Sequence, residues 1–308
     1  MIIKKYFRDI ASSLFGTDNF SRLNTDDFKY PLDLMFTLDN SNVFYQYLDD
    51  NGIPYRIYET VGLQYNPTRI AAFGLAHYNK FIEESDLASR DIFLKMANWF
   101  LDIEDARYTY SFDWGELKSP WISCMSQGEA ASILIRAYKL TNEDKYLHHA
   151  LKSIEPFFID IEHGGVQSLI DNKYIFLEEY PSNNSQHVLN GFLYALIGLV
   201  EILFVYKNSE LSEFRDKLLD SLYENIDKWG PGKWSFYQID SDKKIKNYCT
   251  PSYHNLHITQ LKFINYHFPN EEITKVIYRW TEGKHSKIIR VNSLFYKIAY
   301  RLNNKAQR

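Results

Sequence analysis

The stretch VLNGFLYALIGLVEILFVY (residues 188–206) is almost wholly apolar, and the charged stretch ELSEFRDKLLDSLYENIDKW (residues 210–229) follows it closely. Both place apolar residues at the three-and-four spacing of an α-helix. A helix that is apolar all round is buried on every side, whereas the charged helix keeps one face for water. The two stretches therefore predict a buried inner helix paired with an outer helix.

The same alternation recurs along the chain. Helical periodicity also appears at residues 67–82, 89–103, 126–140, 142–158, 254–268 and 270–280, which makes four pairs in all. The first helices of successive pairs begin 60 to 65 residues apart, near Pro67, Gln127, Asn190 and Asn255. These first helices also carry small residues that let helices approach closely, such as Gly74, Gly128, Ala130 and Gly198. The pattern predicts a mainly α protein, an incomplete (α/α) toroid whose inner helices line a central cavity. A plain helical bundle is the alternative.

Short strand patterns lie between the helix pairs. Residues 164–181 and 233–254 each predict a β-hairpin, about an Asp-Asn-Lys turn and a Ser-Asp-Lys turn, and residues 105–123 form a Tyr-rich excursion. FYQYLDDNGIPYRIYE (residues 44–59) predicts a further hairpin about a DNG turn. In a toroid the inter-helix connections meet at one end, where we expect the binding cleft.

These patterns divide the chain into three parts. We expect an N-terminal segment with β structure at residues 1–60 and the toroid at residues 61–285. Residues 286–308 form a basic amphipathic C-terminal helix, because Ile288, Phe295 and Leu302 recur on one helical face while Lys and Arg lie elsewhere. Such a helix suits an anionic membrane, the body of the protein or a second subunit of a homodimer, and the sequence leaves these three open.

Composition narrows the function classes. The chain has 308 residues, 45% of them hydrophobic, which is enough for a sizeable core. Its net charge of −4 gives no global basic field, so we predict no nucleic-acid partner. The 17% of aromatic residues suits flat polar ligands such as sugars, and equally suits ordinary packing.

Targeting and cofactor motifs are missing from the sequence. The only cysteines, Cys124 and Cys249, are too few for a disulfide framework and lack zinc spacing, so we expect reduced thiols. The N-terminus lacks a secretory signal and no stretch reaches transmembrane length, so we expect a cytoplasmic protein, with peripheral contact at the inner membrane through the C-terminal helix. There is no GxGxxG, P-loop, GxSxG or HExxH motif, and we predict neither a cofactor nor a metal ion.

Candidate site residues remain on the connections between helices. The stretch FLEEYPS (residues 176–182) puts Glu178 and Glu179 at the end of a predicted strand, which marks either an exposed edge or a site. Other candidates are Tyr180, Tyr237, Tyr253, His187, His254 and His257. By residue type alone, a solvated strand end and hydrogen-bonded core tyrosines explain them equally.

Three blocks of the chain resemble a known family. MSQGEAASILIRAYKLT (residues 125–141), LEEYPSNNSQHVLNGFLYALIGL (residues 177–199) and YHNLHITQLKFI (residues 253–264) resemble motifs of the heparosan and heparan glucuronyl C5-epimerase C-terminal domain, in the same order. The resemblance covers residues 121–285 and implies an (α/α) toroid preceded by β structure. It also implies a cofactor-independent inversion of C5 of D-glucuronate within a polysaccharide, giving L-iduronate.

The resemblance also implies roles for particular residues. Glu179 and Tyr253 match the acid/base positions of the family, and Tyr180 and Tyr237 match two further tyrosines. Proton transfer requires burial to raise the pKa of the Glu, and we expect nearby positive charge to lower that of the Tyr. For substrate binding we predict six residues, namely Gln127, Arg136, Asn190, His254, His257 and Lys244. Asn190 equally suits a helix cap.

One position departs from the family. Animal members have an Arg three residues after the tyrosine that corresponds to Tyr237, and Asp240 stands there in this chain. Arg is suited to bidentate recognition of a carboxylate, so another cation must replace it. The candidates are Arg136, Lys243, Lys244 and Lys246. A polysaccharide lyase, a glycosidase with paired acids and an inactive glycan-binding protein remain as alternative functions.

Overall fold

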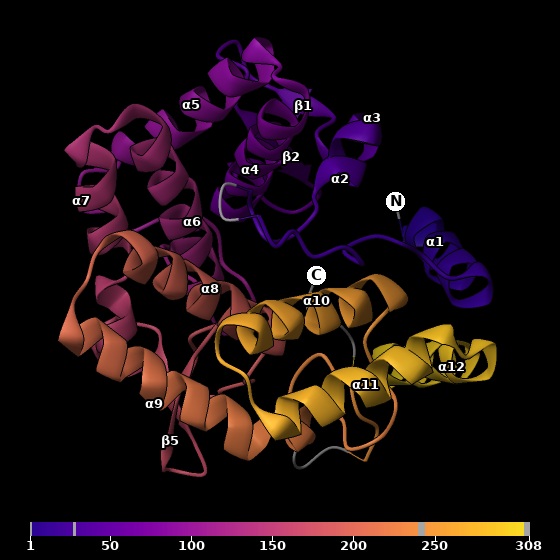
Figure 1. The fold of residues 1–308 in the computed structure, drawn as a ribbon. Coiled ribbons are helices and arrows are strands. Elements are labelled where there is room, and N and C mark those ends of the chain that lie inside the picture. The colour runs from indigo at the N-terminus through magenta and orange to yellow at the C-terminus, as the bar shows by residue number, and fades with distance from the viewer. Residues whose placement is uncertain (1, 27–28, 240–243, 305–308) are drawn as a thin grey trace.

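The inner helices of successive pairs pack on one another in chain order. In the computed structural model, which describes residues 2–26, 29–239 and 244–304, α4 packs on α6, α6 on α8, and α8 on α10. These inner helices are α4 (Pro67–Glu84), α6 (Cys124–Thr141), α8 (Leu189–Val205) and α10 (Pro251–His267). Each packs against its outer partner, α5 (Leu87–Leu101), α7 (Asp144–Ser153), α9 (Ser209–Asn225) or α11 (Glu271–His285). Figure 1 shows the four pairs in an arc, so the predicted incomplete (α/α) toroid is confirmed.

Small residues bring the inner helices together, as the sequence predicts. A Cβ on Gly128 would lie 2.6 Å from the carbonyl oxygen of Tyr194, and a Cβ on Gly198 would lie 2.4 Å from that of Gly128. Contacts this short leave no room for a side chain, so the crossing of α6 and α8 requires glycine at both positions. α8 is buried over most of its length, which agrees with its apolar sequence.

The N-terminal segment closes the arc. The Asn255 side chain of α10 donates to the carbonyl oxygens of Thr17 and Asn19, at 2.7 and 3.1 Å. At the other side of the gap, the Asn79 side chain of α4 accepts from the Tyr30 amide at 2.7 Å. The chain near residues 17–30 therefore joins the last inner helix to the first one. The segment also contains the short helices α2 (Met35–Asp39) and α3 (Ser41–Phe44).

Two small antiparallel sheets support one end of the toroid. β1 (Tyr47–Leu48), β2 (Pro54–Tyr58) and β3 (Gly62–Tyr65) form the first sheet, and β4 (Gln167–Ile170) pairs with β5 (Tyr174–Leu177) about the predicted Asp-Asn-Lys turn. In its described part, the hairpin predicted at residues 233–254 is a short antiparallel pairing, in which Phe236 bridges Tyr248 and backbone hydrogen bonds join Tyr237 to Asn247 and Cys249 to Ser235. Its Ser-Asp-Lys turn lies outside the described residues.

Two of the outer helices are shorter than predicted and end in 3₁₀ turns. η1 (Glu155–Phe158) continues from α7, where the proline at position 156 lacks the N–H of an α-helix, and η2 (Ile161–His163) precedes β4. η3 (Ile226–Trp229) continues from α9. The predicted helices at residues 142–158 and 210–229 therefore each end in a 3₁₀ turn.

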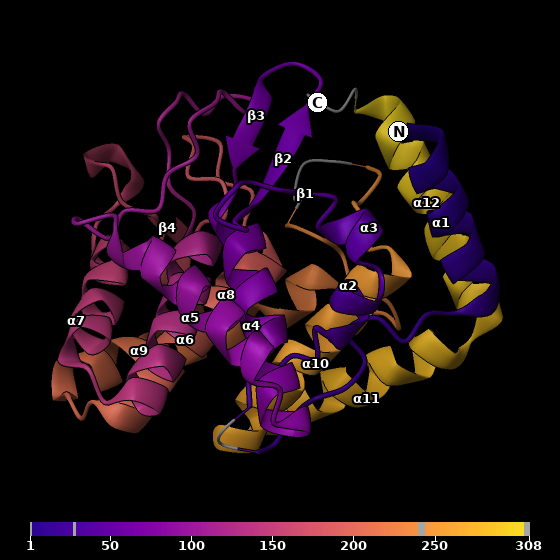
Figure 2. The ribbon, with the colours of Figure 1, turned by 90° about the horizontal axis from the view of Figure 1, so that it is seen from above.

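The two terminal helices lie side by side. α1 (Ile2–Phe15), which the sequence analysis does not predict, runs antiparallel to α12 (Lys287–Asn303) on one flank of the molecule (Figure 2). Arg301 of α12 forms a 2.8 Å ion pair with Asp9, and Arg290 donates to the carbonyl oxygen of Ser13. Among the described residues, no helix combines the length and apolar character needed to cross a membrane.

Candidate active site

The two adjacent carboxylates lie just beyond the end of β5. Because the strand stops at Leu177, Glu178 and Glu179 are not held to the alternating directions of a strand. Glu178 is fully buried; it accepts from the Ser168 hydroxyl at 2.7 Å and from the His187 amide at 3.1 Å. The Nδ1 of His187 also lies 2.6 Å from Glu178 Oε1, the oxygen that accepts from Ser168. Glu178 therefore anchors the loop that leads to α8, and its burial excludes the exposed edge, one of the two alternatives that the sequence left open.

Glu179 is also buried, and it accepts hydrogen bonds from two neighbouring side chains. Its side chain is 7% exposed, Asn190 donates to Oε2 at 3.1 Å, and the Tyr237 hydroxyl donates to Oε1 at 3.2 Å. Burial raises the pKa of Glu179 to about 7, although hydrogen bonds from Tyr180, Tyr237 and Asn190 oppose the rise. A carboxyl with this pKa can accept and return a proton near neutral pH.

Three tyrosines surround Glu179. The rings of Tyr237 and Tyr253 meet edge to face with centroids 5.5 Å apart, and Tyr180 hydrogen bonds with both Glu179 and Tyr237. Tyr253, in the first turn of α10, exposes 42% of its surface. Burial within the site, followed by the charge of Glu179, raises the pKa of all three phenols. The expectation that positive charge lowers the pKa of Tyr253 is therefore wrong, and the phenols are proton donors at neutral pH.

Gly191 makes room for Glu179 at the start of α8. A Cβ at this position would lie 2.6 Å from the Glu179 Cβ and 2.7 Å from its Oε2. The backbone of α8 thus passes directly against the carboxyl group. Asn190 neither caps the helix nor is it exposed to a ligand, because Val188 is the N-cap and Asn190 is 1% exposed. Its observed role is to orient Glu179.

Glu129 is a buried carboxylic acid that the sequence analysis missed. It lies on α6 directly after Gly128 and is 2% exposed, and within the described residues its Oε2 has no hydrogen-bond partner. Burial, followed by the charge of Glu179, raises its pKa well above the ordinary value. The signal in the sequence was a Glu within a run of small residues, Gly128 to Ser132, on the inner helix α6. The buried setting of Glu129 therefore disfavours a second negative charge beside Glu179.

An aromatic wall borders the site. Tyr110 stacks on Trp121 with centroids 4.2 Å apart, and Trp121 lies 6.1 Å from the Tyr180 ring. An open groove of about 720 Å³ continues outward from Trp121 and Pro181, and Lys118, Asn183 and Asn184 also line it. The Tyr-rich excursion and the segment that follows β5 thus meet at one end, as predicted, and Tyr237 joins them there.

Three of the residues predicted to bind substrate are fully buried. The Gln127 amide accepts from the Tyr108 amide and donates to the carbonyl oxygens of Ala106 and Ser153. His254 and His257 both bond to the Ser235 hydroxyl, at 2.8 and 3.1 Å, and burial lowers the pKa of each to about 3. Their burial leaves no surface for a substrate. The neutral histidines instead fix the 233–250 segment on α10 and so position Tyr237.

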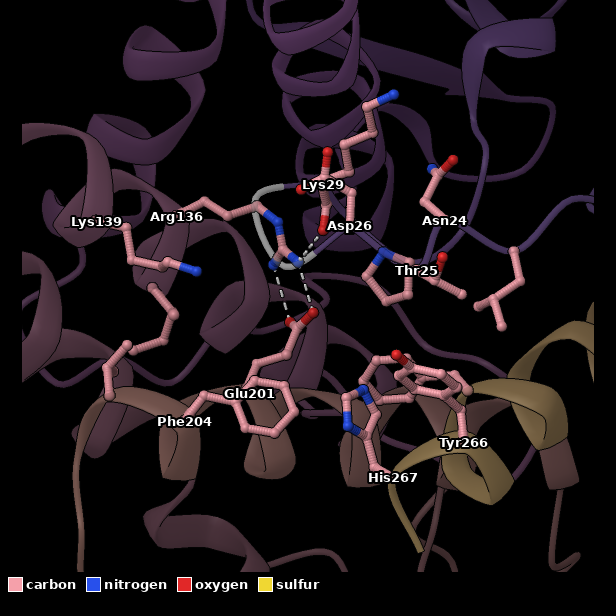
Figure 3. Close-up of a pocket in the computed structure, with 15 residues that line it drawn as sticks. Asn24, Thr25, Asp26, Lys29, Arg136, Lys139, Glu201, Phe204, Tyr266 and His267 are labelled. Carbon is pink, nitrogen blue, oxygen red and sulfur yellow. Dashed lines mark hydrogen bonds and ion pairs between the residues drawn. The ribbon is translucent and has the colours of Figure 1, made fainter. Parts of the chain in front are cut away.

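Arg136 lies at the opposite end of α6. It is 12 residues beyond Cys124, which corresponds to about 18 Å along the helix axis. Its guanidinium forms a buried bidentate pair with Glu201, at 2.6 and 2.9 Å, beside a small cavity of about 30 Å³ (Figure 3). The prediction that Arg136 binds the substrate of the Glu179 site is not supported by this position.

Arg136→Met is expected to destabilise the protein rather than to weaken substrate binding. Removing the guanidinium leaves Glu201 buried without its partner, which typically costs about 3–5 kcal/mol. Urea denaturation should show this loss, and the double variant Arg136→Met/Glu201→Leu should recover most of it. Unchanged stability together with a raised KM would instead assign Arg136 to the substrate.

Two segments of the chain contain lysines that are candidates to bind a substrate carboxylate. Lys244 is exposed and Lys246 is partly exposed, while Asp240 and Lys243 lie outside the described residues. Lys297 of α12 donates to the Asn247 side chain at 2.6 Å, and its ammonium group lies 5.6 Å from the centroid of the Tyr237 ring. Sequence analysis missed Lys297 because it is 60 residues from Tyr237 in the chain. Within the described residues, no group of three His, Cys, Asp or Glu side chains is arranged to hold a metal ion.

Comparison with known proteins identifies sequence relatives. A family model described as D-glucuronyl C5-epimerase C-terminus matches residues 101–282, which include Glu179, Tyr237 and Tyr253. The D-glucuronyl C5-epimerase of Caenorhabditis elegans is 32% identical over 184 residues, covering 54% of this chain and 30% of that protein. An uncharacterized protein of Methanocaldococcus jannaschii is 27% identical over 188 residues, covering 57% of this chain and 56% of that protein. The matches thus span less than two thirds of either relative.

A solved structure shares the fold. The unsaturated glucuronyl hydrolase of Bacillus sp. GL1 superposes with a TM-score of 0.54 at 12% sequence identity, covering 98% of both chains. At this identity the likeness concerns the fold alone. The likeness supports the toroid fold and extends beyond the four helix pairs, since it covers 98% of this chain.

Proposed function

The chain belongs to the D-glucuronyl C5-epimerase C-terminal family, and from that premise we propose that it inverts C5 of D-glucuronate within a polysaccharide to give L-iduronate. The observation that carries the proposal is Glu179, a nearly buried carboxyl with a pKa of about 7 that is held by Asn190 and Tyr237. Heparosan, a glucuronate-containing polymer, is the first substrate to test. No cofactor takes part in the proposed reaction.

The proposed reaction begins with Glu179 as the base. The carboxylate takes the C5 proton, the C5–H bond breaks, and its electron pair moves into the substrate carboxylate to form an enediolate. Tyr253 then gives its phenolic proton to the opposite face of C5, which inverts that centre. The raised phenol pKa supports the role of Tyr253 as the acid, because the phenol is protonated before the reaction begins.

Two proton transfers restore the starting state. After one turnover Glu179 is protonated and Tyr253 is a phenolate. Tyr237 touches both residues, through its hydroxyl at 3.2 Å from Glu179 and through its ring at 5.5 Å from Tyr253. We propose that the proton leaves Glu179 through the Tyr237 hydroxyl and that Tyr253, which is 42% exposed, regains a proton from solvent, so that the net charge is unchanged.

Positive potential at the site supports an anionic substrate. Glu179 meets the first turn of α8 at Asn190 and Gly191, and Tyr253 lies in the first turn of α10. The N-terminal end of a helix carries partial positive charge, which favours a carboxylate. We propose that Lys297, beside Tyr237, supplies the full positive charge that the family Arg provides at the place of Asp240.

Lys297→Met is expected to lower kcat/KM for a glucuronate polymer about 10- to 100-fold, because a charge-assisted hydrogen bond to the substrate carboxylate is lost. Lys297→Arg should restore most of the activity, since the charge returns. Lys287→Met, an exposed position on the same helix, serves as the matched control and should behave as the parent protein. A fully active Lys297→Met protein would rule out this assignment.

The reaction itself is tested in deuterated water. Incubation with heparosan should introduce deuterium at C5 and produce iduronate, seen by NMR, while the chain length stays constant. A lyase would instead shorten the chain and give an unsaturated product that absorbs in the ultraviolet, and a glycosidase would give new reducing ends. Binding of the polymer without any exchange would identify a glycan-binding protein and overturn the proposed function.

A further inference from the structure

Formal charge is segregated between the terminal helices and the body of the chain. Residues 1–16 hold three Lys or Arg and one Asp, and residues 287–308 hold six Lys or Arg and no acidic residue. The remaining 270 residues hold 26 Lys or Arg and 38 Asp or Glu, which gives them a formal charge of −12. The two terminal segments together carry +8. The net charge of −4 for the whole chain is therefore the sum of a strongly basic terminal region and an acidic remainder.

Large apolar side chains are exposed on both terminal helices. On α12, Ile288, Phe295 and Leu302 are 74%, 65% and 75% exposed, and their spacing of seven residues places them on one face of the helix. On α1, Phe7 and Leu14 are also exposed and seven residues apart. Each helix thus has an outer apolar stripe that the protein body does not cover.

The two helices form one continuous layer. They lie side by side and antiparallel on one flank of the molecule (Figures 1 and 2), joined by the Asp9–Arg301 ion pair and the Arg290–Ser13 hydrogen bond. We call this pair, residues 2–15 and 287–303, the terminal platform. Its contacts within the protein use Arg290 and Arg301, so the pair is held together by groups other than the exposed apolar residues.

We propose that the terminal platform docks on the surface of an anionic lipid membrane. A basic segment gains about 1 kcal/mol for each Lys or Arg near an anionic membrane surface, and exposed Phe, Ile and Leu gain further by entering the acyl boundary. A second copy of this chain would bring one platform of formal charge +6 against another across a two-fold axis, which is unfavourable. A nucleic acid would not desolvate the apolar stripes. This inference is independent of the reaction at Glu179.

Vesicle co-sedimentation tests the proposal with the full chain. The protein should bind vesicles of 30 mol% phosphatidylglycerol in phosphatidylcholine at least about 10-fold better than pure phosphatidylcholine vesicles, and 0.5 M NaCl should remove most of that preference. The double variant Ile288→Ser/Leu302→Ser should lose at least about five-fold in binding. Leu87→Ser/Leu169→Ser, two exposed leucines on α5 and β4, is the matched control and should bind as the parent protein does.

A labelled variant separates insertion from simple attraction. Both native cysteines are buried, so Phe295→Cys offers one accessible thiol for an environment-sensitive fluorophore. Its emission should shift to the blue on the anionic vesicles if the apolar stripe enters the membrane. Equal binding to both kinds of vesicle, or binding unaffected by the double variant, would overturn the proposal. Loss of a dimer in the double variant, seen by sedimentation velocity without any vesicle binding, would show instead that the platform joins two copies.

Discussion

Glu179→Gln is expected to lower C5 deuterium exchange by a factor of at least about 1000, because the glutamine amide cannot accept the proton. In the parent protein, exchange from glucuronate should rise with pH and level off above about pH 7, since the active form of the base is the ionised carboxylate with a pKa of about 7. NMR of the polymer after incubation in deuterated buffers measures both results. Exchange that persists in the variant would assign the base to another residue.

The same substitution should stabilise the protein at alkaline pH. The pKa of Glu179 rises from 4.5 to about 7 on folding, so the native state binds the proton more tightly than the unfolded state. Below pH 4.5 the carboxyl is neutral in both the native and the unfolded state and does not change the free energy of unfolding. Between pH 4.5 and 7 the free energy of unfolding falls as pH rises. Above pH 7 the ionised carboxylate lowers it by its full effect, which is on the order of 3 kcal/mol.

Glu179→Gln removes this effect. Urea denaturation at pH 8 should therefore show the variant to be more stable than the parent, whereas the two should be alike at pH 4.5. Glu178→Gln provides the contrast, because Glu178 accepts bonds from Ser168 and His187 and its replacement should destabilise the protein at pH 8. A Glu179→Gln protein that is inactive but less stable at pH 8 would indicate a structural failure rather than the loss of a base.

The toroid could be predicted because its physical cause is local. The contrast between an apolar helix such as α8 and a charged one such as α9 repeats along the chain, and helical periodicity is visible in a short window. α1 was missed because its packing depends on α12, which is more than 270 residues away in the sequence. The hairpin predicted at residues 233–254 has only a short pairing in its described part for a related reason, since His254 and His257 of α10 bond to Ser235 and hold one arm against that helix.

The site was only partly predictable from the sequence. Glu179 and its tyrosines come from segments that the resemblance pointed to, and the structure brings them together. Arg136 lies in the same sequence block as Gln127, but a helix carries residues of one block to opposite ends of the domain. Glu129 and Lys297 could not be assigned because their relevance depends on burial and on distances between segments. The role of Gly191 could not be predicted from the sequence either, since only the structure reveals that its missing side chain makes space for Glu179.

Tyr253→Phe is expected to separate inversion from exchange. The phenylalanine keeps the ring contact with Tyr237, whose centroid lies 5.5 Å away, but has no proton to give to the opposite face of C5. Glu179 can still remove the C5 proton, exchange it with solvent through Tyr237 and Tyr180, and return a deuteron to the original face. Iduronate formation should fall at least about 1000-fold, whereas deuterium should still enter glucuronate at a rate within about 10-fold of the parent.

NMR distinguishes deuterated glucuronate from iduronate in one experiment. Tyr278→Phe is the matched control, because Tyr278 is an exposed tyrosine on the outer helix α11 and should affect neither product. An equal loss of exchange and inversion in Tyr253→Phe would mean that Tyr253 acts in proton removal or in holding the substrate. Retention of both would mean that Tyr180 or Tyr237 delivers the proton, since each is a protonated phenol beside the same carboxylate. Exchange without inversion would require two separate proton donors on the two faces of the sugar ring, which is the essential feature of the proposed mechanism.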